Sequence, residues 1–99
     1  MTTEAFVTTQ EFLLPAGLER EVLVDAVDSA LRRVGRRSLL RRDDAYECAR
    51  IVTDASFGEI VPEVRELEGL VQRIRDEITP AAPIVDALLD LRLRLRSSG

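Results

Sequence analysis

The stretch that decides the fold is residues 60–78, IVPEVRELEGLVQRIRDEI. Its apolar residues are spaced four, three, four, three and four apart, which places them on one stripe of an α-helix. They are Ile60, Val64, Leu67, Val71, Ile74 and Ile78. Because such a stripe must be buried against another element, the spacing predicts a helical protein.

Three other segments carry helical spacing. Residues 18–34 have two neighbouring apolar rows, and Gly35 follows at the position where a left-handed residue closes a helix. Residues 44–56 have a narrow face of small side chains, and residues 83–96 have an inner row of one isoleucine and three leucines. We therefore expect helices at 18–34, 44–56, 62–78 and 83–96. We expect Leu39 and Leu40 to anchor the connector 38–42 to the core.

Two segments leave alternatives open. Residues 1–17 contain a β-prone run, Phe6-Val7-Thr8-Thr9, and are interpreted as an extended arm that ends near Pro15 and Gly17. Residues 90–96 alternate between charged residues and leucine, as a half-buried strand also does. We favour an all-α fold, a small bundle of about four helices with an N-terminal extended arm. The alternative is an α+β fold in which the arm and the C-terminal tail form a short strand pair.

The stripe in residues 60–78 is also compatible with a coiled coil. It lasts only about two and a half heptads, which is shorter than a coiled coil usually requires. In a parallel dimer Glu63 and Glu68 would face each other, and like charges at these positions oppose pairing. The pattern therefore favours the core of a bundle, with an antiparallel homodimer left open.

Composition excludes several classes of chemistry. The chain has 99 residues, which suits one domain, and 45% of them are hydrophobic and 32% charged. It has no histidine, so the commonest general base and metal ligand are missing, and its single cysteine, Cys48, allows neither an internal disulfide nor a thiolate metal cage. We expect no catalytic residue, metal, cofactor or small-molecule substrate. The apolar runs are too short to span a membrane, and residues 1–4 lack a secretory signal, so we expect a cytoplasmic protein.

The basic residues are distributed unevenly. All 14 of them are arginine, and lysine and asparagine are both missing, which indicates a GC-rich bacterial genome such as that of an actinobacterium or its phage. Six arginines and no acid lie between Arg32 and Arg42. Removing these six charges from the net charge of −4 leaves −10 on the other residues. This asymmetry could serve an acidic protein partner, self-association or nucleic acid, or it could be a solvated surface.

Three local features have simple structural interpretations. Asp44 followed by Glu47 has the spacing of a capping box, so Asp44 is interpreted as a helix N-cap. Cys48 lies on the small apolar face of residues 44–56 and is interpreted as a small buried hydrophobe. Asp28 and Arg32 are spaced to form a surface ion pair.

These observations favour a non-enzymatic protein–protein interaction module, such as an accessory subunit, adaptor or regulator. It would present helical surface to a protein partner or to itself. The candidate partner-binding residues are Arg36, Arg37, Arg41, Arg42, Leu93, Arg94 and Arg96. The alternative is a nucleic-acid-associated bacterial or phage regulator that uses the Arg32–Arg42 basic patch. Against it, the chain is acidic, with a pI near 4.8, and no aromatic residue lies among the arginines.

Overall fold

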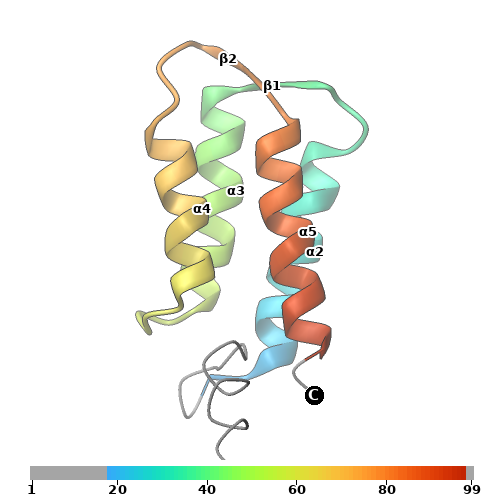
Figure 1. Cartoon of the computed structure of the whole chain (residues 1–99), viewed down its shortest axis with the longest axis vertical. Coiled ribbons are helices and arrows are strands. Elements are labelled where there is room, and N and C mark those ends of the chain that lie inside the picture. The colour runs from blue at the N-terminus through green and yellow to red at the C-terminus, as the bar shows by residue number, and fades with distance from the viewer. Residues whose placement is uncertain (1–17, 98–99) are drawn as a thin grey trace, which may run out of the picture.

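The computed structural model describes residues 18–97, within which four helices form an up-and-down bundle closed at one end by a two-stranded sheet (Figure 1). The elements are, in chain order, α2 (Arg20–Val34), β1 (Leu39–Arg41), α3 (Arg42–Ala55), α4 (Pro62–Gln72), β2 (Ile78–Pro80) and α5 (Ala82–Ser97). Each helix packs against the helices that precede and follow it, and α5 also packs against α2. The prediction of a small helical bundle is confirmed.

The interior is built from aliphatic side chains. The largest fully buried residues include Leu23 from α2, Leu67 from α4 and Leu88 from α5. On α3 the buried face consists of Ala45, Cys48, Ala49 and Val52, as predicted. Small side chains let neighbouring helices approach closely, which explains why a face with so little apolar area suits the centre of the bundle. Among the described residues Ser56 is the only buried polar one, and its hydroxyl donates a hydrogen bond to Thr53 O at 2.6 Å.

The helix boundaries follow the sequence pattern at most ends. Gly35 closes α2 with a positive φ of 63°, and its N–H donates to Leu31 O at 2.9 Å, so the predicted closure of the helix at this glycine is confirmed. The inner row of α5 is buried as predicted and comprises Ile84, Leu88, Leu91 and Leu95. The predicted ion pair between Asp28 and Arg32 is wrong. Asp28 Oδ1 instead lies 2.8 Å from Arg92 Nε and links α2 to α5, while Arg32 donates to the hydroxyl of Ser29.

The helix expected at residues 62–78 is shorter than predicted. It ends at Gln72, so only the middle of the apolar stripe, Val64, Leu67 and Val71, is buried in α4. Ile60 precedes the helix and is 66% exposed, and Ile78 lies in β2 and is 48% exposed. The prediction extended the helix to Ile78, just before the Pro80 that disfavours the helical conformation at Thr79. Residues Ile78–Pro80 instead form β2, and the β-branched side chains of Ile78 and Thr79 favour this extended chain.

The two strands fasten the connections α2–α3 and α4–α5 across the end of the bundle (Figure 1). They are antiparallel, with Leu40 opposite Thr79. Flanking backbone hydrogen bonds run from Arg42 N to Glu77 O at 2.8 Å and from Ala81 N to Ser38 O at 2.9 Å. Leu40 points into the core and is 1% exposed, whereas Leu39 is 56% exposed. The predicted anchoring is therefore right for Leu40 and wrong for Leu39.

The alternative strand pair between the arm and the C-terminal tail does not form. The tail is helical to Ser97, because Leu91 and Leu95 continue the inner row of α5 and are buried. The arm, residues 1–17, lies outside the described residues, so its predicted extended conformation stays a prediction. The strand pair that does form uses Leu39–Arg41 and Ile78–Pro80, two segments that the sequence pattern did not mark as strands.

The opposite environments of Leu39 and Leu40 give a test of this closure. Replacing Leu40 with alanine should lower the free energy of unfolding by about 2–5 kcal/mol, because it leaves a cavity beneath the sheet. Replacing Leu39 with alanine should change it by about 0.5 kcal/mol or less. Urea unfolding followed by circular dichroism measures both values. Equal losses in the two variants would contradict the observed register.

Candidate functional site

The predicted partner-binding residues lie in two separate regions. The first region, which we call the arginine corner, comprises Arg36, Arg37, Arg41 and Arg42. It lies at the end of the bundle that carries the strands. The second region is in the last turns of α5 and comprises Leu93, Arg94 and Arg96. Figure 1 shows the C-terminal end of α5 at the opposite end of the bundle. The two groups therefore form two surfaces rather than one site.

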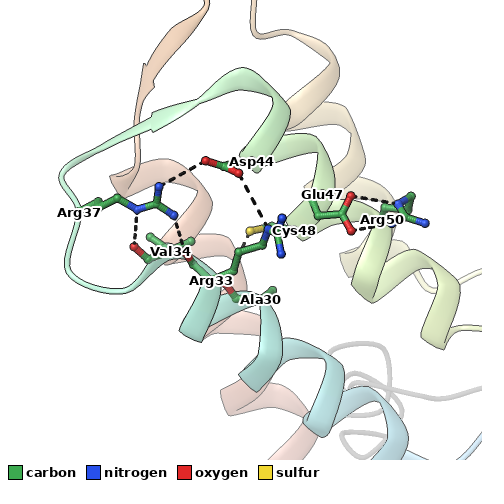
Figure 2. Close-up of polar contacts among 8 residues, drawn as sticks. All are labelled: Ala30, Arg33, Val34, Arg37, Asp44, Glu47, Cys48 and Arg50. Carbon is green, nitrogen blue, oxygen red and sulfur yellow. Dashed lines mark hydrogen bonds and ion pairs between the residues drawn. The ribbon is translucent and has the colours of Figure 1, made fainter.

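Arg37 is held against the end of α2 (Figure 2). Its Nε donates to Val34 O at 3.1 Å, and its Nη2 donates to Arg33 O. Its Nη1 donates to Asp44 Oδ2 at 3.3 Å, and Arg33 Nε lies 4.0 Å from the other oxygen of the same carboxylate. Arg37 therefore satisfies carbonyls at the C-terminus of α2, and Asp44 ties that terminus to α3.

The capping role predicted for Asp44 is wrong. α3 begins at Arg42, two residues earlier than expected, and no side chain caps its N-terminus. Because β1 leads the chain into the helix at Arg41, Asp44 lies in the first turn and faces α2. Glu47 also makes no capping contact. It accepts two hydrogen bonds from Arg50, at 2.6 and 3.2 Å, and these lower the pKa of the Glu47 carboxyl (Figure 2).

The other members of the arginine corner differ in their contacts. Arg42 donates from Nη1 to Arg75 O at 3.2 Å and holds the segment that precedes β2. Within residues 18–97, the side chains of Arg36 and Arg41 are exposed and make no hydrogen bond or ion pair. Arg41 and Arg42 line a small depression together with Asp43, Glu77 and Ile78. The sequence has no acidic residue between Arg32 and Arg42, but the fold places the carboxylates of Asp43 and Glu77 beside Arg41 and Arg42.

The predicted residues of α5 also differ. Arg94 is occupied by acidic neighbours, with Nε 2.9 Å from Asp90 Oδ2 and Nη1 3.6 Å from Glu63 Oε2 on α4. The hydrogen bond that Arg94 donates to Asp90 raises the pKa of Arg94 further above its ordinary value. Leu93 is 65% exposed, and Arg96 is exposed without an ion pair in the described part of the chain.

Sequence reasoning missed that Leu93 and Arg96 belong to a longer stripe. We call it the outer stripe of α5, and it comprises Ala82, Asp86, Leu89, Leu93 and Arg96. These residues are spaced four, three, four and three apart, and all of them are exposed. The helix therefore has leucines on two sides. The inner row is buried in the bundle, and Leu89 and Leu93 lie on the exposed side. The signal was present in the sequence, but the sequence analysis selected Leu93 and Arg96 from the alternating tail of residues 90–96 and did not connect them with Leu89 and Asp86.

A shallow groove runs along α4 on the side of α5, with a volume of about 750 Å³. Its apolar lining includes Ile60, Leu70 and Ala87, and its charged lining includes Glu63 and Glu66. The mixture of aliphatic and charged groups on an open surface is typical of the rim of a protein interface.

Cys48 is enclosed by the bundle. Its thiol donates to Ala30 O at 3.6 Å, and burial raises the pKa of the thiol despite the nearby arginines (Figure 2). A protonated, buried thiol is a poor nucleophile. The prediction that Cys48 is buried is confirmed. Over residues 18–97 no three acidic, cysteine or histidine side chains are grouped closely enough to hold a metal ion.

The comparisons with known proteins identify no relative: no family model, curated protein or solved structure matches the chain. None of the helices in residues 18–97 combines the length and apolar character needed to cross a membrane.

The link between Asp44 and the end of α2 can be tested against its neighbour Asp43. Both carboxylates lie in the first turn of α3, so both interact with the helix dipole, but only Asp44 contacts the two arginines. Asp44→Ala should lower the free energy of unfolding by about 0.5–1 kcal/mol more than Asp43→Ala at low salt. The difference should shrink in 1 M NaCl because exposed pairs are screened. Urea titrations measure both, and equal losses would contradict the link.

The burial of Cys48 predicts slow modification. In the folded protein its reaction with a disulfide reagent such as DTNB at pH 8 should be at least about a hundredfold slower than in urea, because reaction requires local opening of the bundle. A Ser97→Cys variant supplies an exposed reference thiol on the same chain and should react rapidly. Equal rates for the two thiols would show that α2 and α3 do not enclose Cys48.

Proposed function

We propose that this chain is a non-enzymatic interaction module that binds a protein chain through the outer stripe of α5. One observation supports this proposal above the others. Leu89 and Leu93 are 46% and 65% exposed and lie one turn apart on a helix whose inner row already completes the core. Neighbouring exposed leucines add nothing to the interior, and such apolar surface commonly marks a site of protein contact.

The arginine corner has a smaller part in this proposal. Arg37 supports the end of α2 and Arg42 supports the segment before β2, so these two charges serve the fold. The side chains of Arg36 and Arg41 make no ion pair within the described chain, so these two members of the arginine corner can contact a partner. The nearby Asp43 and Glu77 reduce the positive potential that a phosphate backbone would require, which favours a protein partner over nucleic acid.

We also propose that the protein acts in the cytoplasm. A bundle stabilised by aliphatic packing with one buried cysteine does not depend on disulfide bonds, so it is suited to a reducing compartment. An accessory subunit, adaptor or regulator would use the same surface, because each acts by presenting a helix face to another chain.

The experiment compares two exposed leucines. Tagged wild-type protein, Leu93→Glu and Leu39→Glu are used to capture proteins from a lysate of the source cells, with quantification by mass spectrometry. A carboxylate on the outer stripe should reduce capture of the bound partner by at least about tenfold, because it must be desolvated in the interface. Leu39→Glu places the same charge at the strand end of the bundle and should leave capture unchanged.

Two controls make the outcome decisive. Circular dichroism should show the same helix content in all three proteins. An Arg36→Glu/Arg41→Glu variant tests the arginine corner without removing the contacts of Arg37 and Arg42. If Leu93→Glu retains every partner, the outer stripe is not the binding surface. If Arg36→Glu/Arg41→Glu instead abolishes salt-sensitive retention of duplex DNA, the nucleic-acid function replaces the proposed one.

A further inference from the structure

The outer stripe of α5 carries opposite charges at its two ends. Asp86 lies toward the N-terminus of the helix and Arg96 toward its C-terminus, about 15 Å apart at 1.5 Å per residue. Leu89 and Leu93 occupy the space between them. Within residues 18–97 neither Asp86 nor Arg96 makes an ion pair, so both charges on this stripe lack an internal partner.

The stripe is symmetric about the level of Leu91. Leu89 and Leu93 each lie two residues from that level, and Asp86 and Arg96 each lie five residues from it. A two-fold axis at this level would therefore place Leu89 beside Leu93 of a second copy. The same operation would place Asp86 beside Arg96 of the second copy, twice in each dimer. Such self-complementarity is what an isologous interface requires.

The charge order also selects one orientation. In an antiparallel pair of α5 helices both ends of the stripe meet an opposite charge. In a parallel pair Asp86 would meet Asp86 and Arg96 would meet Arg96, and like charges brought together oppose association. The neighbouring charges do not upset this pattern, because Asp90 and Arg94 already pair with each other and Arg92 pairs with Asp28.

We infer that the occupant of the outer stripe is a second copy of this chain, bound with its α5 antiparallel across a two-fold axis near Leu91. This inference rests on the proposed function, since it names the partner of the same surface. Two leucines per copy bury less than the roughly 1,200 Å² typical of tight complexes, so the dimer should be weak and concentration-dependent.

The test uses sedimentation equilibrium of the full chain between about 1 and 500 μM in 50 mM NaCl, a range that brackets a micromolar dissociation constant. Wild-type protein should change from monomer to dimer, and Leu93→Glu should remain monomeric. Asp86→Arg and Arg96→Asp should each weaken dimerisation by at least about tenfold, because each creates two contacts between like charges. The combined variant, Asp86→Arg/Arg96→Asp, should restore dimerisation, because the reversed charges again meet opposite charges in the antiparallel pair.

The matched control is Glu59→Arg. Glu59 is exposed in the connection between α3 and α4 and makes no ion pair in the part of the chain described, so this variant has the same change in net charge at a position outside α5 and its stripe. It should dimerise like the wild type. If it weakens dimerisation as much as Asp86→Arg, net charge rather than the stripe controls association.

The remaining outcomes separate this inference from the proposed function. A wild-type chain that stays monomeric over the whole range overturns the second copy as occupant, while lysate capture that depends on Leu93 would still support binding of another protein. A dimer that survives Leu93→Glu overturns the stripe as its interface. A dimer whose combined charge variant is not restored overturns the antiparallel orientation.

Discussion

Burial of aliphatic side chains between helices is the constraint on which the rest of this structure depends. The buried apolar side chains of residues 18–97 are leucine, isoleucine, valine, alanine and cysteine, and Tyr46 and Phe57 are exposed. Because no aromatic ring is buried in this part of the chain, the packing of its helices gains stability from many small contacts, so the helices must lie close together. The alanine-rich face of α3 satisfies this requirement, because short side chains reduce the distance between helix axes.

This close packing determines how the ends of the bundle are built. The connections from α2 to α3 and from α4 to α5 cross the same end, and their backbones pair as β1 and β2. The pairing satisfies backbone groups that would otherwise need solvent, and it directs Leu40 into the core as a cover. It also explains the contacts of the arginine corner. Arg37 and Arg42 donate to backbone carbonyls near these connections, so part of the positive charge of the chain stabilises its irregular segments.

The same packing leaves α5 with a second apolar side. Its inner row fills the core, and its link to α4 through Arg94 and to α2 through Arg92 fixes the rotation of the helix. With this rotation Leu89 and Leu93 face outward, between an acidic and a basic residue that form no ion pair with the rest of residues 18–97. A surface that joins apolar area to unsatisfied charge of both signs is suited to binding a protein, and its symmetry suits a second copy of the same chain. The proposed binding of a protein and the inferred antiparallel dimer thus both depend on one feature, the rotation of α5.

The sequence by itself determined the helical class, the inner rows of α2, α3 and α5, the closure at Gly35 and the burial of Cys48. These follow from spacing and local conformational preference, which act over a few residues. Only the tertiary structure decided where the apolar stripe of residues 60–78 leaves the helix, since Ile78 pairs instead with a strand residue 37 positions earlier in the chain. It also decided that Asp44 contacts Arg37 instead of capping its own helix, and that Asp28 meets Arg92. Each of these outcomes depends on which distant segments the bundle brings together, and local spacing contains no information about such neighbours.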